Sequence, residues 1–463
     1  MSLKELCSQY KLIHDKLHGY IPITIFAKKM IDTKYFQRLR ELNQLGTCKY
    51  VFPNAVHTRF EHSIGTYYMA DKILNTIIMY TDQNSINDYL SNIIELKSYY
   101  EREYSSKIFK LDKYVCELIK IAALCHDIGH GPFSHVFDDF YLPLIGKNNE
   151  IGSSHEERSG LIIDIIIKSD DILSKYIGID EIQFIKNLIN PTKEHNGFIY
   201  QIVSNNVTGL DVDKFDYLMR DIEMINFQAK IDVSRLVEHI RIIKNTIVYP
   251  EQAIFDIYNL FQTRHRLHVQ IYSHNVTISI QYLVVEIFKL MDEFIGISDS
   301  IYNMNKFCDM TEGYILNSAK ILCKLNKLFT DEQNEKINKA LKLINDLDER
   351  RLYPTIYSFK SKEKLNITDI LKDIEYDENI IVYQHKIGFV SGNKPNPFND
   401  IYVYKTKDTT KMIDGIEIFK NNKDKITMLM PEKYQEYINI IFYKNRLNYD
   451  KILYLQEYFK LLF

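Results

Sequence analysis

Apolar residues recur at three- and four-residue steps through most of the first 290 positions, which is the period of an amphipathic helix. The clearest example is VCELIKIAALCHDIGH at residues 115–130. Residues 254–293 contain neither proline nor glycine, so we expect one long helix there. Residues 317–350 show the same period again. This spacing predicts a large lobe made of helices.

The pattern changes after about residue 353. Residues 380–390, IIVYQHKIGFV, and 400–406, DIYVYKT, are rich in β-branched and aromatic residues and lie on either side of a Gly/Asn/Pro segment. This composition predicts a strand, a loop and a second strand. Residues 430–444, MPEKYQEYINIIFYK, return to a helical period, so we expect a helix near the C-terminus.

These patterns predict a mainly α protein in two parts. The larger part is an all-helical core over residues 1–325, in which residues 81–112 form a polar, variable insertion. The smaller part is a mixed α+β C-terminal lobe over residues 326–463. We find no internal repeat and no low-complexity tract.

The composition is typical of a globular protein, with 46% hydrophobic and 26% charged residues and a formal net charge of −3. This charge argues against a dedicated nucleic-acid binder, although it allows a local basic pocket. The N-terminus is too polar for a signal peptide, and the most apolar run, residues 161–167, is too short to span a membrane. Six scattered cysteines without a CxxC pair favour reduced thiols. We therefore expect a cytoplasmic or nuclear protein without a membrane anchor.

Four segments concentrate histidine and acidic residues. They are HTRFEH (57–62), CHDIGHGPFSH (125–135), SSHEERSG (153–160) and GLDVDKFDYLMRD (209–221). Imidazole nitrogens and carboxylate oxygens together suit a divalent metal such as iron, manganese or zinc. On a helix, His126 and His130 are four residues apart and would share one face. Gly129, Gly131 and Pro132 should end the helix there.

The pair His126–Asp127 supplies only two metal ligands, so others must come from distant segments. His62 and one of Asp211 and Asp213 are the natural candidates. An open coordination position would then activate water or polarise a phosphoryl oxygen. A single His–Asp pair at a helix end is more often a local hydrogen bond, but four such segments in one chain favour a functional site.

A second group of candidates lies in QTRHRLHVQIYSH at residues 262–274. Arg264, His268 and Tyr272 are four residues apart and would share a helix face, and an arginine suits phosphate because its fork bonds two oxygens. Taken alone, this pattern is more typical of a solvated basic face.

These motifs closely resemble the HD-domain deoxynucleoside triphosphate (dNTP) triphosphohydrolases, whose signature is the ordered set H…HD…D. The resemblance is nearest to the HD core of the eukaryotic enzymes that join this core to a sterile-alpha-motif domain. It extends from about Tyr10 to about residue 437, through YVFPNAVHTRFEHSIG, CHDIGHGPFSH and GLDVDKFDYLMRD. No room precedes Tyr10 for the sterile-alpha-motif domain, so we expect it to be absent.

The resemblance implies hydrolysis of a dNTP to deoxynucleoside and tripolyphosphate, with water attacking the α-phosphorus. It implies a divalent metal held by His62, His126, Asp127 and Asp213. The metal would be iron, manganese, zinc or magnesium, present as one or two ions. It implies a catalytic surround of His130, His135, Asp138, His155 and Glu156, with His135 donating a proton to the leaving 5′ oxygen and His155–Glu156 as the alternative pair.

The same resemblance implies a binding site for the nucleotide. The triphosphate would be held by Arg59, Lys214, Arg264 and His268. The deoxyribose would be held by Gln44, Leu45, Tyr217, Asp221 and Tyr272, with a tyrosine ring excluding the ribose 2′-OH.

Several members of the family are tetramers assembled by GTP and dNTP activators, so we expect a homo-dimer or homo-tetramer. Residues similar to those of the activator sites are Lys11, Asp32, Gln37, Arg40, Arg235, Arg350 and Lys405. Other activator positions depart from the family pattern, at His14, His239, Asn275 and Pro354. These departures predict either different activators or activity without one.

Two alternatives stay open from the sequence. The first is another HD-type phosphohydrolase, acting on a nucleotide monophosphate, a cyclic nucleotide or an alarmone. The second is a nucleotide sensor or single-stranded nucleic-acid binder that keeps the pocket without efficient catalysis. The intact H…HD…D set argues against the second, and the implied sugar contacts argue against the first.

Overall fold

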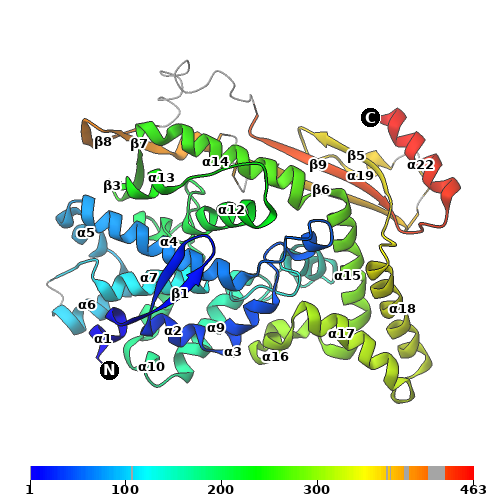
Figure 1. Cartoon of the computed structure of the whole chain (residues 1–463), viewed down its shortest axis with the longest axis horizontal. Coiled ribbons are helices and arrows are strands. Elements are labelled where there is room, and N and C mark those ends of the chain that lie inside the picture. The colour runs from blue at the N-terminus through cyan, green and yellow to red at the C-terminus, as the bar shows by residue number, and fades with distance from the viewer. Residues whose placement is uncertain (1, 106–107, 372–373, 376, 391–395, 415–432) are drawn as a thin grey trace.

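The computed structural model describes residues 2–105, 108–371, 374–375, 377–390, 396–414 and 433–463. Helices make up most of it, and Figure 1 shows them as one mass, with most of the strands along one edge and the hairpin of residues 10–24 in front of the helices. The helices of the first half are α1 (Leu3–Ser8), α2 (Ile25–Ile31), α3 (Lys34–Gln37), α4 (Arg59–Tyr80), α5 (Gln83–Leu90), α6 (Lys97–Tyr104), α7 (Lys113–Cys125), α8 (Leu142–Leu144), α9 (His155–Ser169), α10 (Leu173–Tyr176), α11 (Ile179–Ile189) and α12 (Val212–Ile225).

The second half of the chain adds more helices and most of the strands. Its helices are α13 (Ser234–Glu238), α14 (Ile254–Leu267), α15 (Asn275–Ile295), α16 (Met304–Asp309), α17 (Glu312–Leu322), α18 (Asp331–Asp348), α19 (Ile367–Ile370) and α22 (Tyr449–Leu462). The strands of the whole chain are β1 (Tyr10–Asp15), β2 (Gly19–Thr24), β3 (Arg241–Ile243), β4 (Thr246–Pro250), β5 (Thr355–Ser361), β6 (Ile380–Gly388), β7 (Tyr402–Lys405), β8 (Asp408–Asp414) and β9 (Gln435–Tyr443).

The centre of the helical lobe is α7, which packs against α4 and α11. The carboxylate of Asp112 caps its N-terminus by accepting hydrogen bonds from the amides of Tyr114 and Val115. Nearly every later residue of the helix is buried, so this segment is apolar on all sides rather than on one stripe. The helix ends at Cys125, so His126 and His130 lie in the turn that follows and not on one helix face.

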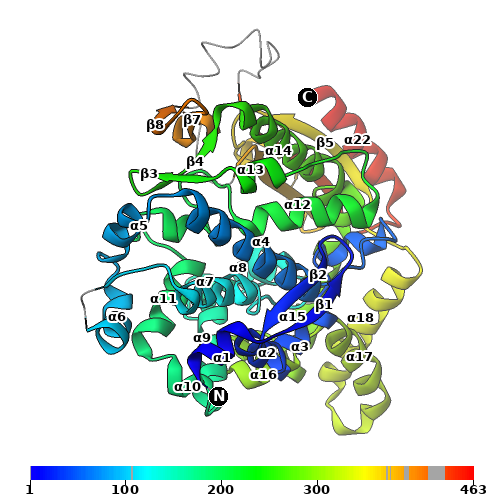
Figure 2. The ribbon, with the colours of Figure 1, turned by 60° about the vertical axis from the view of Figure 1, so that its left-hand side comes forward.

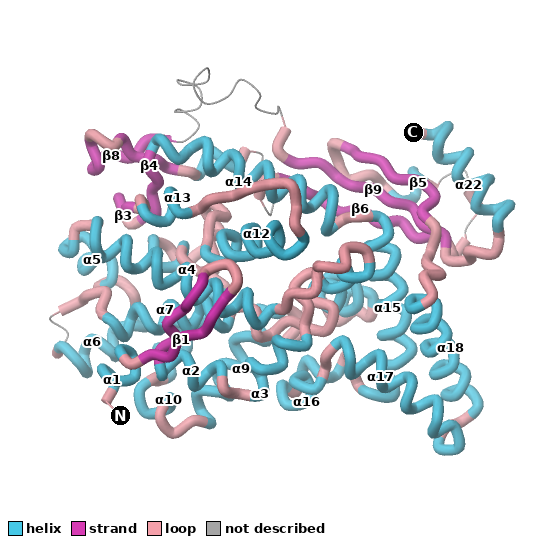
Figure 3. The backbone as a smooth tube through the Cα atoms, viewed as in Figure 1, coloured by secondary structure: helices cyan, strands magenta, loops and turns pink. Residues whose placement is uncertain are grey.

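The strands form three sheets, with the order β1–β2, β3–β4–β7–β8 and β5–β9–β6 (Figure 3). The predicted fold class, mainly α with a smaller α+β C-terminal part, is confirmed. The predicted all-helical core nevertheless contains the β1–β2 and β3–β4 hairpins. Tyr249 of β4 pairs in parallel with Val403 of β7, so one of these hairpins continues into a sheet of the C-terminal lobe.

Two helix predictions are wrong. Residues 254–293 form α14, a π-helical turn over His268–Tyr272 and then α15, instead of one helix. The break needs no glycine or proline because the His274 side chain caps α15 by accepting from the Val276 amide. The interrupted turn places Tyr272 and the end of α14 beside the cavity described below.

The helix predicted over residues 430–444 is a strand. Residues 435–443 form β9, the central strand between β5 and β6, while 430–432 lie outside the described residues. Both faces of β9 are covered, so Ile440, Ile441 and Phe442 are all buried and the sequence loses the alternation of a half-exposed strand. A short continuous apolar run of this kind cannot be assigned to helix or strand from periodicity alone.

The sheet β5–β9–β6 lies between the helical lobe and the C-terminal helix α22 (Figure 2). One face of the sheet packs into the main core through residues such as Tyr383 and Ile387. The other face meets α22 in a second small core that includes Ile441, Leu455 and Phe459. The insertion predicted at 81–112 contains α5 and α6. Among the described residues, no helix is both long and apolar enough to cross a bilayer.

Candidate active site

A cavity of about 890 Å³ lies between the helical lobe and the sheet β5–β9–β6. It is lined by most of the residues singled out from the sequence: Gln44, Leu45, Arg59, His126, Asp127, His130, His135, His155, Glu156, Asp213, Lys214, Tyr217, Asp221, Arg264, His268 and Tyr272. His62 and Asp138 are not among the lining residues and reach the site through contacts with those that are.

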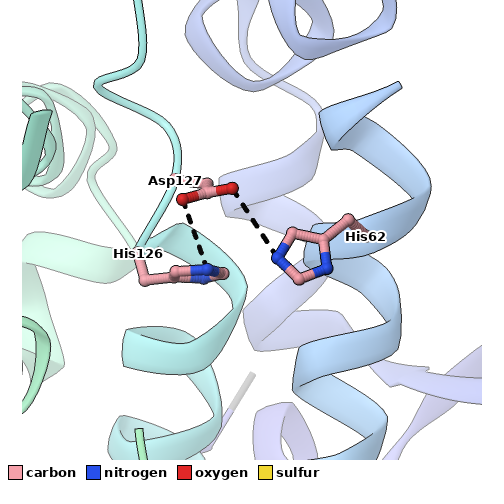
Figure 4. A group of neighbouring side chains, drawn as sticks. All are labelled: His62, His126 and Asp127. Carbon is pink, nitrogen blue, oxygen red and sulfur yellow. Dashed lines mark ion pairs between the residues drawn. The ribbon is translucent and has the colours of Figure 1, made fainter. Parts of the chain in front are cut away.

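Four candidate metal ligands converge at one end of the cavity. Nε2 of His62 lies 3.1 Å from Asp213 Oδ1 and 3.6 Å from Asp127 Oδ2. Nε2 of His126 lies 3.3 Å from Asp127 Oδ1 and 3.5 Å from Asp213 Oδ1. Figure 4 shows His62 approaching from α4 while His126 and Asp127 approach from the turn after α7. Three segments far apart in the sequence therefore bring two imidazoles and two carboxylates together.

The surrounding hydrogen bonds turn both imidazoles toward this centre. Nδ1 of His126 lies 2.8 Å from the carbonyl oxygen of Ala123, so it donates there and leaves Nε2 as the acceptor. Among the described residues that buried Nε2 has no hydrogen-bond partner, and its nearest carboxylate oxygens lie 3.3 and 3.5 Å away in ion-pair contacts. Nδ1 of His62 lies 2.9 Å from Asp216 Oδ2, which likewise leaves Nε2 facing Asp127 and Asp213.

Both the donor atoms and the electrostatics suit a divalent cation. His62, His126 and Asp127 each offer a ligand atom, and these atoms lie within 4.8 Å of one another. Burial lowers the pKa of His62, but hydrogen bonds with Asp213 and Asp216 outweigh this and raise it to about 10. The carboxylates therefore favour positive charge at this position. A metal ion can supply that charge, and the unpartnered Nε2 of His126 is a ready ligand.

Asp216 anchors the site from behind and was not singled out from the sequence. It is buried and accepts hydrogen bonds from Arg220, and its Oδ1 lies 2.6 Å from His18 Nε2. The space beside it is filled, because a Cβ added at Gly65 would lie 1.9 Å from Asp216 Oδ1. The tight packing of Asp216 and Arg220 fixes the orientation of His62.

Three further histidines form a cluster next to the metal ligands. The rings of His130 and His155 are stacked with centroids 3.9 Å apart, and the His135 ring meets His130 edge-on at 5.2 Å. Phe133 and Ser134, just before His135, have φ of 58° and 57°. Left-handed backbone at two residues with side chains is costly and is found mostly at functional sites. This turn sends the His135 side chain into the open part of the cavity.

Carboxylates contact His135 and His155. Asp139 Oδ2 lies 3.3 Å from His135 Nδ1. Enclosure by the cavity walls lowers the pKa of His135, but the hydrogen bond and the charge of Asp139 outweigh this and raise it above the usual 6.5. Asp138 contacts His155 and is ion-paired with buried Arg158, which holds the pKa of Asp138 far below its usual value despite burial. A protonated His135 beside an ionised Asp139 can act as a general acid.

The opposite end of the helical wall carries the predicted sugar contacts. Asp221 lies 2.7 Å from Nε2 of His57 and accepts a 2.5 Å hydrogen bond from the hydroxyl of Tyr272. Within the described part of the chain, the buried side-chain oxygen of Gln44 has no hydrogen-bond partner, and the backbone amide of Gln44 donates to the carbonyl of His57. This group offers polar atoms for a hydroxyl-bearing ligand, and His57 was missed although it lies in the motif HTRFEH.

The predicted phosphate-binding cations are anchored within the protein. Arg59 contacts Asp127 and donates to Ser134 Oγ at 3.0 Å. Lys214 donates to the carbonyl of Gly209, and Arg264 donates to the carbonyl of Gly388 in β6. These contacts fix the three cations along the cavity wall.

The seven predicted activator residues lie elsewhere. Within the described part of the chain, none of them lines the cavity, and all are partly or fully exposed. Asp32, Gln37 and Arg40 are close in sequence, and their side chains are exposed or partly exposed. Arg40 Nε donates to Gln37 Oε1 at 2.9 Å, and Asp32 pairs with Lys28. The others come from separate elements: Lys11 on β1, Arg235 on α13, Arg350 after α18 and Lys405 at the end of β7.

Comparison with known proteins identifies the family. No family model matches the chain. It is 40% identical over 410 residues to an HD domain-containing protein, L394, of Acanthamoeba polyphaga mimivirus, with 85% of each chain covered. It is 31% identical over 437 residues to the SAMHD1 homolog of Dictyostelium discoideum, named a deoxynucleoside triphosphate triphosphohydrolase, with 92% of this chain and 76% of the relative covered.

The chain belongs to the SAMHD1 family of HD-domain proteins. Human SAMHD1, also named a deoxynucleoside triphosphate triphosphohydrolase, is 27% identical over 478 residues, covering 94% of this chain and 70% of the human protein. The resemblance recognised from the motifs is therefore confirmed. The residues of the ordered H…HD…D motif, His62, His126, Asp127 and Asp213, are the ones that converge at the end of the cavity.

Proposed function

We propose that this protein is a metal-dependent dNTP triphosphohydrolase that releases deoxynucleoside and tripolyphosphate. The observation that carries the proposal is the convergence of His62, His126, Asp127 and Asp213 at the end of a cavity lined by basic and sugar-binding side chains. The names of the SAMHD1 relatives support the same substrate class.

The fit of the donor atoms supports one divalent metal at His62, His126, Asp127 and Asp213. When bound, this metal would lower the pKa of a water molecule and polarise the α-phosphoryl oxygen. A second group, Asp127, His130 and His155, also has its ligand atoms within 4.8 Å and is the candidate for a second ion. The metal is iron, manganese, zinc or magnesium.

The protein's own residues would position and protonate the substrate. Arg59, Lys214 and Arg264 lie where they can neutralise the triphosphate, and His268 lies where it can donate a hydrogen bond to it. Water attacks the α-phosphorus, the bond to the 5′ oxygen breaks, and His135 gives that oxygen its proton. The water oxygen therefore leaves with the tripolyphosphate. His155 with Glu156, whose contact is 3.4 Å, is the alternative proton-transfer pair.

The sugar end of the cavity would select deoxyribose. Asp221, Gln44 and Tyr272 offer hydrogen-bonding atoms for the 3′-OH, and the Tyr217 and Tyr272 rings with Leu45 enclose the sugar. Packing alone rejects an added hydroxyl only weakly, so the 3′-OH contacts must place C2′ against a ring for selectivity to be strong.

Regulation by nucleotides is part of the proposal. Lys11, Asp32, Gln37 and Arg40 would bind guanine-containing activators, and Arg235, Arg350 and Lys405 would bind activator phosphates between subunits of a homo-dimer or homo-tetramer. Their exposure fits an interface site. The catalytic core would span residues 1–325, and the lobe at 326–463 would take part in assembly.

The test is an assay of purified protein with each dNTP and each rNTP, with Mg²⁺ or Mn²⁺, with and without GTP. Nucleoside and tripolyphosphate should appear together from dNTPs, and in ¹⁸O-labelled water the label should enter tripolyphosphate alone. Label in the nucleoside, or release of monophosphate or diphosphate instead, would assign a different phosphohydrolase reaction. Absence of all hydrolysis by folded, metal-loaded protein would contradict the proposal.

A further inference from the structure

The outer wall of the cavity belongs to the C-terminal lobe. Strand β6 lines it from Val382 to Gly388, together with Lys364, Ile367 and Val390. None of the described residues that this lobe contributes to the wall is acidic, whereas the helical wall contributes six carboxylates: Asp127, Asp139, Glu156, Asp211, Asp213 and Asp221. The carboxylates among the described lining residues therefore all lie on the helical wall, and the wall formed by the C-terminal lobe carries Lys364, His385 and Lys386.

His385 is the side chain of β6 that faces the predicted phosphate-binding residues. Its ring is stacked on that of His268, with centroids 6.4 Å apart and planes 19° apart, and on Tyr383, at 6.0 Å and 14°. On this strand the odd-numbered residues face the main core and the cavity, because Ile381, Tyr383 and Ile387 are all in that core. His385 is the odd-numbered position between Tyr383 and Ile387, and it lines the cavity.

A second contact ties the same strand to a predicted phosphate ligand. The guanidinium of Arg264 donates a hydrogen bond to the carbonyl of Gly388, three residues after His385. Enclosure by the cavity walls lowers the pKa of His385; Asp139 opposes this shift, and nearby cations including Arg264 reinforce it. These neighbours place the His385 imidazole within the electrostatic reach of both Arg264 and Asp139.

We propose that β6 forms part of the triphosphate-binding site and that His385 donates a hydrogen bond to the terminal phosphates of the substrate. This inference rests on the proposed dNTP triphosphohydrolase function. An imidazole N–H stacked beside His268 and close to Arg264 adds a donor where the negative charge of the triphosphate is furthest from the metal end. The C-terminal lobe then contributes directly to substrate binding.

His385 binds the part of the substrate that does not change during bond breaking. A contact made equally in the ground state and the transition state lowers KM and leaves kcat nearly unchanged. Hydrogen bonds to charged groups are strong enough that loss of one weakens binding roughly 10-fold or more. Loss of His385 should therefore raise KM by about 10-fold, with kcat within about 3-fold.

The experiment uses three substitutions that separate hydrogen bonding from stacking. His385→Phe keeps a ring against His268 and Tyr383 but has no donor, His385→Gln keeps a donor without the ring, and His385→Ala removes both. His265→Ala is the matched control, because His265 lies one turn before His268 on α14, pairs with Glu436 and is not among the lining residues.

Two measurements are made on each full-length variant. The first is calorimetric binding of inorganic tripolyphosphate in the presence of Mg²⁺, which needs no turnover. The second is KM and kcat for a dNTP. Ala and Phe should weaken tripolyphosphate binding and raise KM by about 10-fold, Gln should recover part of both, and the His265 control should match the wild type.

Each outcome decides the inference. Wild-type affinity in all three His385 variants overturns it, as does full recovery by Phe, which would reduce His385 to a stacking role. Failure of the wild-type protein to bind tripolyphosphate also overturns it. Wild-type binding of tripolyphosphate without dNTP hydrolysis would contradict the proposed function instead, and the binding series would still decide the role of His385.

Discussion

The two walls of the cavity differ in how their residues are held and in how their sequences look. Five histidines and six carboxylates of the helical wall line the cavity, and the supporting residues His62 and Asp216 behind them are completely buried. The strand wall carries a few polar side chains in an apolar β6, without any motif. The comparison teaches that a dense cluster of titratable groups needs a rigid supporting shell, whereas a binding wall needs only a strand at the right place.

The helical wall should be the more sensitive to single substitutions. Replacing Asp127 with Asn removes a candidate metal ligand and should lower hydrolysis by on the order of 10³-fold or more, because the activated water depends on the metal. Asp213→Asn should act in the same direction. The measurements are nucleoside release and metal content by mass spectrometry.

The control for this prediction is the thermal stability of each variant. Asp127 is buried against Arg59, so Asp127→Asn leaves a buried cation without its partner and can destabilise the protein. The side chain of Asp213 is 39% exposed, so Asp213→Asn should leave the unfolding temperature nearly unchanged. Near-normal activity in a folded Asp213→Asn protein would refute the ligand assignment.

The strand wall can be disturbed without touching any side chain of the site. A Cβ added at Gly388 would lie 2.7 Å from the carbonyl oxygen of Tyr434, the residue just before β9. Gly388→Ala should therefore push β6 away from the start of β9. We expect a loss of about 1–3 kcal/mol of unfolding free energy and a rise in KM of roughly 10-fold, because Arg264 is bonded to the Gly388 carbonyl.

Gly313→Ala is the matched control for that prediction. Gly313 lies in α17, where an added Cβ would meet no described atom within 4 Å apart from its chain neighbours and the nearby backbone of its own helix, so alanine there should be neutral or stabilise by up to about 1 kcal/mol. Circular dichroism during thermal unfolding measures both variants, since the chain has no tryptophan. Equal stability of the two variants would show that β6 yields easily to the added methyl group.

The sequence predicted the helical wall better than the strand wall, because only the helical wall is built from recognisable motifs. His62, His126 and Asp127 could be named as candidates because the motifs are short, local and rich in side chains that are rare together, whereas the choice of Asp213 over Asp211 came from the family resemblance. His385 could not be named, because one histidine in an apolar strand has no pattern, and its neighbours Arg264 and His268 are more than 100 residues away in the sequence.

The errors in the fold have local physical causes. The strand β9 was predicted as a helix because it is covered on both faces, and the break between α14 and α15 was missed because a histidine side chain caps it in place of glycine or proline. Asp216 and His57 lay inside recognised motifs, yet their roles as supports for His62 and Asp221 depend on contacts across elements.

The pH profile offers a finer comparison within the helical wall. If His135 is the general acid, activity falls as pH rises through its pKa, which Asp139 holds above 6.5. Asp139→Asn removes the main cause of that rise, so the alkaline side of the profile should move to lower pH by up to about one unit. The profile of kcat, measured in both proteins, tests this.

A matched acidic residue gives the control for this shift. Asp71→Asn changes a carboxylate on α4 that pairs with Lys120 and does not line the cavity, so its profile should coincide with that of the wild type. An unchanged alkaline side in Asp139→Asn would exclude His135 as the acid and favour His155 with Glu156.

The smallest effect should come from Glu436 at the rim, where its ion pair with His265 joins the two walls. Glu436 on β9 lies 3.0 Å from His265 Nε2 on α14 and 2.6 Å from Lys360 Nζ on β5, and these side chains are 28%, 28% and 49% exposed. Partly exposed pairs contribute about 0–1 kcal/mol, so Glu436→Gln should cost no more than this. Although burial opposes the shift, Lys360 and His265 lower the pKa of Glu436 below 4.5.

The sign of the pH dependence follows from that lowered pKa. The contribution of Glu436 is fully present above about pH 4.5 and is lost as pH falls through the lower folded-state value. The difference in unfolding free energy between the wild type and Glu436→Gln should therefore shrink as pH falls below 4.5, as followed by circular dichroism. A difference well above 1 kcal/mol would show that the two walls are coupled through this rim and not only through the buried face of the sheet.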